Sequence, residues 1–206
     1  MTREVFIMMG LLMAAAAVGA QEKPAAGAKA PPAEIKDADV DRMNEAATPG
    51  PMHQWLAQLA GDWKYESTMW TAPGVPPTVM GGDCEKKMTF GGRFLEEFHR
   101  GTSMGKVAEG RNVTGWDNLQ KQFVGNWIDN ASTGIIETRG RLEADGKTMT
   151  LEAEMLNPMN ERREKLHLVY RIQDADHHSF EYWVKGVKGA ADHKFMEIRY
   201  TRKGKA

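Results

Sequence analysis

The stretch QLAGDWKYESTMW, residues 58–70, joins two different sequence patterns. Just before it and at its start, apolar residues recur at the spacing of one helix face: Met52, Trp55, Leu56 and Leu59. Gly61 suits the left-handed position that ends many helices. From Trp63 onward, apolar and polar residues alternate, which is typical of a strand. The chain therefore places its largest side chain where a short helix becomes the first strand.

The alternation continues to the end of the chain. Turn sequences such as Gly91-Gly92 and Asp145-Gly146 interrupt it at short intervals. The cleanest run is residues 148–155, TMTLEAEM. We expect strands near residues 62–71, 78–90, 93–100, 107–116, 120–129, 133–141, 147–156, 163–173, 178–186 and 193–203.

This series of strands has no second helix between its members. A parallel sheet needs crossover connections, usually helices, so the sheet is expected to be antiparallel. One apolar face per strand allows a sandwich or a barrel, and closure alone removes the exposed edges. The sequence therefore predicts an all-β fold, a roughly ten-stranded antiparallel up-and-down β-barrel with a short N-terminal helix plugging one end.

The helix-to-strand junction fits the base of such a barrel. Gly61 lets the chain turn sharply, and Trp63 is the first inward residue of the first strand. The last strand closes the cylinder beside the first, and Arg202 lies on its inward face. We expect Arg202 to stack on Trp63 through a cation–π contact.

The first 50 residues differ in composition from the rest. Residues 1–20 are typical of a signal peptide, since an uncharged apolar run of 14 residues follows Arg3 and small residues precede Gln21. The run is shorter than the roughly 20 residues that span a bilayer, so no stable membrane insertion is expected after cleavage. Residues 21–50 are rich in Ala, Pro and charge and predict a disordered linker. Residues 51–206 then form the barrel domain of a secreted or periplasmic protein.

The charge and the cysteine content of the chain limit the classes of partner that it can bind and the ways in which its fold can be stabilised. After removal of residues 1–20 the chain keeps 26 basic and 27 acidic residues, well interspersed, which argues against a nucleic-acid partner. Cys84 is the single cysteine and can form no internal disulfide. The fold must therefore be stabilised by its apolar core, and we expect a monomer or a weak dimer.

Several motifs resemble known families. Gly-x-Trp after an N-terminal helix, paired with a basic residue near the C-terminus, is similar to the calycin superfamily of lipocalin-like and fatty-acid-binding barrels. The segments HQWLAQLAGDW, GGRFLEEF, GWDNLQKQFVGNWIDNASTG, DGKTMTLEAEM and MEIRYTRK resemble the family called domain of unknown function 1579. This resemblance implies a barrel and export, and it implies no activity.

The barrel interior is the place to look for a site. Barrels of about eight strands can hold one small ligand, and diameter grows with strand number, so ten strands should leave room. Strand parity predicts a ligand-binding lining: Tyr65, Lys86, Met88, Phe94, Glu96, Phe98, Arg100, Phe123, Trp127, Leu151, Leu168, Tyr170 and Tyr182. A solid core filled by these side chains is the alternative.

The charged members of this lining are Lys86, Glu96 and Arg100, which fall in register with apolar neighbours. A buried charge is costly unless it is paired. These groups either contact the polar head of a ligand or pair with each other near a barrel mouth.

Metal and catalytic motifs are not evident. His177 and His178 are neighbours on a strand, so they point to opposite faces. A haem-binding barrel similar to nitrobindin needs an inward histidine, whereas His167, His193 and His99 fall on outward faces. No nucleophile elbow or metalloprotease motif is present. We therefore expect no metal, no cofactor and no catalytic residue.

The sequence thus favours an exported, non-catalytic barrel that binds a small apolar or amphipathic molecule. An interaction or structural module with a filled core is one alternative. A cavity enzyme or a nitrobindin-like haem protein is the other.

Overall fold

The computed structural model describes residues 36–71, 75–103, 105–157, 161–187 and 189–204. Its helices are α1 (Asp37–Ala47) and α2 (Pro51–Ala57), and no helix in these residues is long and apolar enough to cross a membrane. The predicted signal peptide lies outside the described residues. The strands are β1 (Gly61–Met69), β2 (Thr78–Thr89), β3 (Phe94–Ser103), β4 (Lys106–Asp117), β5 (Gln122–Asp129), β6 (Ile136–Leu142), β7 (Thr148–Asn157), β8 (Arg162–Ile172), β9 (His177–Val184) and β10 (His193–Arg202).

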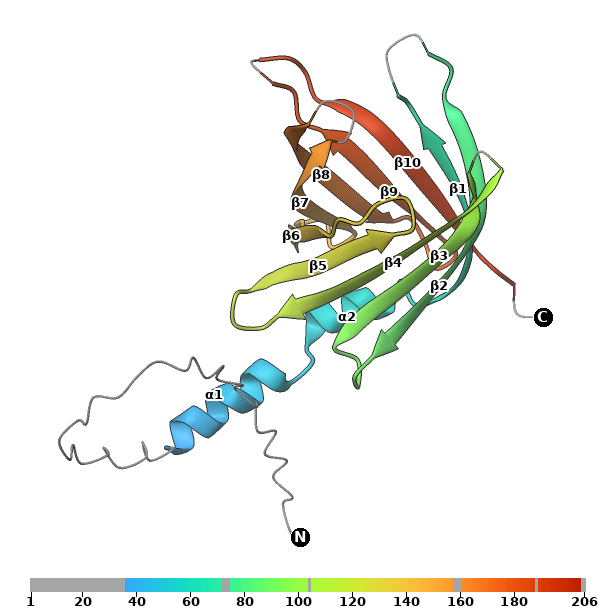
Figure 1. Ribbon diagram of the computed structural model, residues 1–206. Coiled ribbons are helices and arrows are strands. Elements are labelled where there is room, and N and C mark those ends of the chain that lie inside the picture. The colour runs from blue at the N-terminus through green and yellow to red at the C-terminus, as the bar shows by residue number, and fades with distance from the viewer. Residues whose placement is uncertain (1–35, 72–74, 104, 158–160, 188, 205–206) are drawn as a thin grey trace, which may run out of the picture. The chain divides into compact units, whose positions relative to one another are not determined.

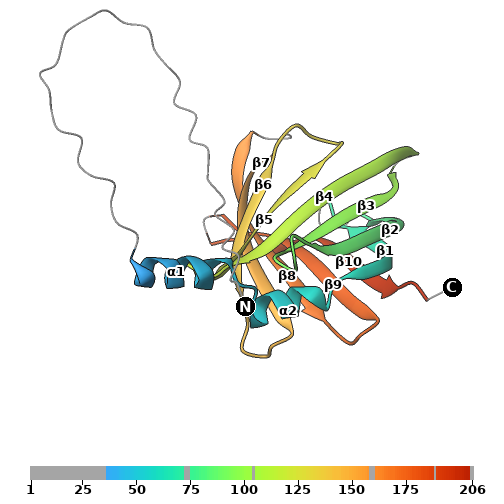
Figure 2. The ribbon, with the colours of Figure 1, turned by 90° about the horizontal axis from the view of Figure 1, so that it is seen from below.

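The ten strands form one closed antiparallel barrel. Each strand pairs with its neighbours in sequence, and β1 also pairs with β10, which closes the cylinder. Figures 1 and 2 show the strands wrapping around a common axis, with α2 at one end. The up-and-down barrel predicted from the alternation of the sequence is confirmed.

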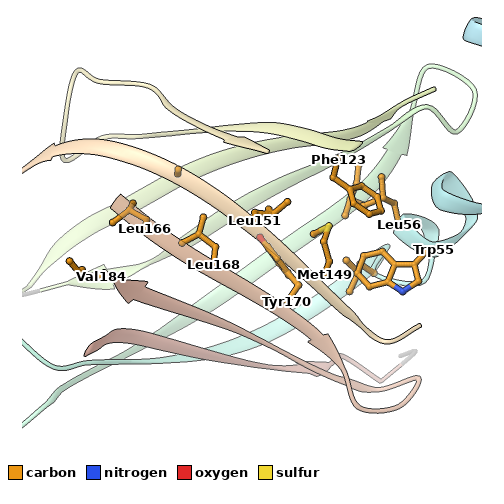
Figure 3. Close-up of a cluster of buried hydrophobic side chains, with 12 residues drawn as sticks. Trp55, Leu56, Phe123, Met149, Leu151, Leu166, Leu168, Tyr170 and Val184 are labelled. Atoms are coloured by element: carbon orange, nitrogen blue, oxygen red, sulfur yellow. The ribbon is translucent and has the colours of Figure 1, made fainter. Parts of the chain in front are cut away.

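Helix α2 covers one end of the barrel. Pro51 is the first residue of this helix. At that position a backbone N–H would have no partner within the helix, so proline, which lacks it, costs no hydrogen bond. Trp55 and Leu56 are buried and belong to the same apolar cluster as Phe123 and Met149. Figure 3 shows these four side chains meeting at this end of the interior. The plug expected from the helical spacing is therefore present.

Helix α1 lies within the segment that the sequence predicts to be a disordered linker. The sequence predicts disorder over residues 21–50, and the structure has a helix at Asp37–Ala47. Its acidic first turn complements the helix dipole, and none of its residues is buried. The side-chain amide of Asn118, in the β4–β5 turn, donates to the backbone oxygens of Glu45 and Thr48 at 2.9 and 2.8 Å. These bonds satisfy carbonyl groups that the end of a helix leaves without partners.

The junction between α2 and β1 explains the Gly-x-Trp sequence. Gly61 has φ of +141°, and a Cβ atom there would lie 2.2 Å from Nη1 of Arg202. Trp63 is 1% exposed, and its indole N–H donates to the backbone oxygen of Leu59 at 3.0 Å. Cζ of Arg202 lies 4.0 Å from the centre of the Trp63 ring, and Nη1 donates to the backbone oxygen of Ala60. The predicted pairing of Trp63 with Arg202 is confirmed.

Candidate functional site

A layer of polar side chains crosses the interior above the α2 end. Its centre is an ion pair between Lys86 of β2 and Glu97 of β3, which are directly opposite each other in the sheet. Nζ of Lys86 lies 2.7 Å from Oε2 of Glu97, and the side chains are 0% and 1% exposed. The amide of Asn112 donates to the other carboxylate oxygen at 2.8 Å. These contacts supply the compensation that two buried charges require.

Aromatic rings surround the ammonium group of Lys86. Its Nζ lies 4.1 Å from the centre of the Tyr200 ring and 5.6 Å from that of Tyr170. The Tyr170 hydroxyl also donates to Glu97 at 3.5 Å. Burial by itself would raise the pKa of Glu97, but several contacts together outweigh burial and lower it, the charge of Lys86 first and then the hydrogen bonds from Lys86 and Asn112. The carboxyl group is therefore ionised at neutral pH.

His99 continues this layer from the next inward position of β3. Its Nε2 lies 2.9 Å from the hydroxyl of Tyr200, and its ring contacts the rings of Tyr65 and Trp127 at centroid distances of 5.5 and 5.3 Å. Burial lowers the pKa of His99 to about 4, so its imidazole is neutral at pH 7. Its Nδ1 has no hydrogen-bond partner within the described parts of the chain.

His178 lies on the other side of Tyr200. The two rings are stacked, with centroids 4.3 Å apart and planes 10° apart, and Trp63 meets His178 edge-on at 4.2 Å. Burial lowers the pKa of His178 as well, and the charges of Lys86 and Arg202 act in the same direction. His177, its sequence neighbour, is exposed, which confirms that the two histidines point to opposite faces.

Glycines make room for the large rings of the inner wall. A Cβ atom on Gly101 would lie 2.4 Å from the Tyr65 hydroxyl, and one on Gly110 would lie 2.2 Å from the Trp127 ring. The rings of Tyr65 and Trp127 therefore lie directly over backbone that has no side chain. Both residues remain half-buried although they face inward.

The remaining inner wall is largely apolar. Figure 3 shows a row of side chains along the barrel axis from the α2 end, with Leu151, Leu168 and Leu166 following one another. At the end away from α2, Tyr182 and Phe195 pack together at 5.4 Å and stay half-buried. The inner face is therefore apolar along its length, with the polar layer set deep inside.

Most of the predicted lining faces the interior. The structure places these residues on the inner face, buried or half-buried: Tyr65, Lys86, Met88, Phe123, Trp127, Leu151, Leu168, Tyr170 and Tyr182. Among them, Lys86 and Tyr170 are brought together in the polar layer, and Tyr65 and Trp127 flank it.

The predicted orientation of β3 is wrong. Phe94, Phe98 and Arg100 are exposed on the outer face, and Glu96 is half-buried there. Phe98 is 39% exposed, and Arg100 pairs with Glu109 across the outside of the sheet at 2.7 Å. The reason is the register, because directly opposite residues share a face and even-numbered positions of β2 pair with odd-numbered positions of β3.

The same register places three unpredicted residues inside. Glu97 and His99 are buried where Glu96 and Arg100 are expected from the sequence, and Leu95 is buried in place of Phe94. His99 is thus inward, which corrects its predicted outward face and removes that argument against a haem ligand. The inward position of Lys86 is a sign that could have identified Glu97, because an inward lysine needs an inward acidic partner.

Three of these interior groups could hold a metal ion. The ligand atoms of Cys84, Glu97 and His99 all lie within 4.8 Å of one another. Burial raises the pKa of the Cys84 thiol to about 12, so the thiol is protonated. Lys86 already neutralises Glu97. A divalent ion would have to displace both the thiol proton and the ammonium group.

Comparison with known proteins agrees with this fold. Residues 48–202 match the family described as "Protein of unknown function (DUF1579)". The chain belongs to this family. No curated protein matches the sequence.

Two solved structures share the barrel of this family member. Rv2717c from M. tuberculosis is 18% identical with a TM-score of 0.56, and the match covers 76% of this chain and 100% of Rv2717c. The S-type phycobiliprotein lyase CPES from Guillardia theta is 10% identical with a TM-score of 0.51, covering 80% of this chain and 98% of the lyase. At these identities the likeness shows a common fold.

Proposed function

We propose that this protein is an exported, non-catalytic barrel that binds one small amphipathic molecule inside the cylinder. The observation that carries the proposal is the deep polar layer at the base of an apolar inner wall. An apolar chain would lie along the wall, and a polar end would reach the layer.

Unused hydrogen-bonding atoms of buried side chains support a ligand with a polar group in the interior. Within the described residues, His99 Nδ1, Ser67 Oγ and Thr138 Oγ1 are buried without a hydrogen-bond partner. Buried polar atoms are rarely left unpaired, because each costs roughly 1–3 kcal/mol. A ligand whose polar end bonds to these atoms would remove that cost.

The apolar wall supports an aliphatic or aromatic body for the ligand. Met155, Tyr182 and Phe195 face inward and are half-buried towards the end away from α2, and the half-buried Phe180 packs on Tyr170 beside the polar layer. Methionine and aromatic side chains adapt to irregular apolar molecules. The barrel that this chain shares with a phycobiliprotein lyase is compatible with this role, although the proposal rests on the interior of this chain.

Native mass spectrometry and Nile red fluorescence test the proposal. We expect the purified protein to enhance Nile red emission at a stoichiometry of one dye per chain and to carry a co-purified small molecule. Mass spectra of the intact assembly also report whether the protein is the expected monomer or weak dimer. A bound haem would favour the nitrobindin-like alternative.

A pair of variants locates the binding site. Ala153 is buried on the inner face of β7, whereas Glu154 is its exposed outward neighbour. Ala153→Phe should reduce dye binding because it fills the interior, and Glu154→Phe should leave it unchanged. If neither the dye nor any co-purified molecule binds, the filled-core interaction module is the better description.

Export is part of the proposal and rests on residues 1–20. N-terminal sequencing of the protein from a fractionated bacterial host should give a chain that begins at Gln21. A chain retained in the cytoplasm with Met1 intact would contradict export and leave the binding proposal unaffected.

A further inference from the structure

We propose that the polar end of the ligand is uncharged, so that the barrel binds neutral amphipathic molecules and rejects carboxylates of the same chain length. This inference rests on the proposed function, because it specifies the chemistry of the molecule inside the barrel. It follows from the balance of charge in the polar layer.

The charges in this layer already cancel. Lys86 and Glu97 are the two buried charged side chains in the described part of the chain, and they lie 2.7 Å apart. Lys86 is further engaged by the ring of Tyr200, and Asn112 bonds to the second oxygen of Glu97. The layer therefore has no net charge with which to compensate a charged ligand.

Arg202, the cation at the closed end, is also engaged. Its guanidinium group lies on Trp63 and donates to the backbone oxygens of Ala60 at 2.9 Å and Ala175 at 2.8 Å. These contacts hold the guanidinium at the junction of α2, β1 and β10. It is therefore already bonded and does not supply an unpaired positive charge to the layer around His99.

Apart from the atoms that form ion pairs, the buried polar atoms without a hydrogen-bond partner in the described residues belong to neutral groups. They are the imidazoles of His99 and His178 and the hydroxyls of Ser67 and Thr138. Such groups bond well to an alcohol, a carbonyl or an amide. A carboxylate would add a third charge to a balanced pair, and burial of an unpaired charge is costly. The charge balance therefore selects for an uncharged polar end.

Three ten-carbon compounds test this selectivity: decanol, decanoate and decylamine. Each is used at neutral pH to displace Nile red, which is itself neutral. We expect decanol to bind roughly tenfold more tightly than either charged compound. Decylamine is included because a balanced layer should reject a cation as well as an anion.

A substitution that removes one charge of the Lys86–Glu97 pair provides a second test of this selectivity. Glu97→Gln keeps the size of the side chain and an oxygen for Asn112, but it leaves the charge of Lys86 uncompensated. Decanoate should then bind about tenfold more tightly than it binds the unaltered protein, while decylamine should show no gain. The matched control is Glu96→Gln, the outward neighbour that lies 3.4 Å from Arg111, and it should change none of the three affinities.

The outcomes separate the two proposals. Decanoate binding as tightly as decanol to the unaltered protein would overturn the inference of a neutral ligand while leaving small-molecule binding in place. A folded Glu97→Gln protein with unchanged preferences would overturn it too, because the polar end would not reach the layer. If Nile red and all three compounds fail to bind, the proposed function itself is wrong. If circular dichroism shows that Glu97→Gln does not fold, the affinities of the unaltered protein for decanol, decanoate and decylamine still test whether the barrel prefers an uncharged ligand.

Discussion

The guanidinium of Arg202 lies over the indole of Trp63, with 4.0 Å between Cζ and the ring centre, and the two residues are direct partners in the β1–β10 pairing. This contact joins the first strand to the last at the point where the barrel closes. The same guanidinium donates to the backbone oxygen of Ala60, just before β1 begins. The end of α2, the first strand and the last strand are therefore fixed to one another by a few side-chain atoms.

Removal of this indole should destabilise the fold strongly. Trp63→Ala leaves a large cavity at a fully buried position, and we expect a loss of about 3–5 kcal/mol in the free energy of unfolding. Arg202→Ala should cost less, about 0.5–2 kcal/mol from the cation–π contact. Urea denaturation measures both, with Trp183→Ala on the outer face as a control expected to have a smaller effect. Unchanged transitions in the Trp63 and Arg202 variants would contradict this account of the junction.

Gly61 should not tolerate a side chain. Gly61→Ala places a Cβ atom 2.2 Å from Nη1 of Arg202 and requires an L-residue at φ of +141°. The variant should lose more than about 1 kcal/mol of stability, because the native conformation is incompatible with alanine. Gly134→Ala is the matched control, since a Cβ atom there meets nothing within 4 Å. Equal melting temperatures for the two variants would be the contrary result.

The buried ion pair should behave as a unit. Lys86→Met leaves Glu97 buried and uncompensated, which should cost about 3–5 kcal/mol. The double variant Lys86→Met, Glu97→Leu removes both charges and should recover much of that loss. Lys87→Met, at the exposed neighbouring position, should be nearly neutral. A double-mutant cycle from chemical denaturation gives the coupling, and additive losses would show that the pair is not coupled.

Acidification should weaken the fold before the carboxylates titrate. His99 has a pKa lowered from 6.5 to about 4, so the unfolded chain takes up a proton in this range while the folded chain does not. The free energy of unfolding should therefore fall as the pH drops from about 6.5 to about 4, by up to about 1.4 kcal/mol per pH unit for this histidine. The lowered pKa of His178 acts in the same direction.

The variant His99→Gln tests the source of this pH dependence. Its stability should decline less steeply over the same range, as followed by thermal melting at several pH values. His177→Gln alters an exposed side chain and should keep the slope of the unaltered protein. Identical slopes for all three proteins would assign the effect to other groups.

The cysteine should be chemically silent in the folded protein. Cys84 is 2% exposed, and burial raises its pKa to about 12, so little reactive thiolate forms. We expect Ellman's reagent to modify no thiol at neutral pH until a denaturant unfolds the chain. Rapid modification without denaturant would indicate that the interior opens near β2.

The sequence predicts the strands well because alternation is a local property. Each strand shows its own two-residue period, which residues close together in the chain define. The closed barrel and its junction are predicted from the number of such strands and from Trp63 and Arg202 on the inward faces of the first and last of them. The same reasoning identifies the inward faces of β7 and β8, where apolar residues occupy every second position. The helix α1 is missed because its composition is that of a solvated segment, and none of its residues is buried.

The face of β3 is a different problem, because both of its faces carry apolar and charged residues. Phe94 and Phe98 outside resemble core residues, and Glu97 and His99 inside resemble surface residues. Only the pairing of Lys86 with Glu97 and of Cys84 with His99 settles which set points inward, and that register depends on how the β2–β3 turn joins the strands. By itself, then, the sequence determined the closed barrel, its helical plug and the Trp63–Arg202 junction. The tertiary structure decided the polar layer, because a buried charge is stable only where the register provides its partner.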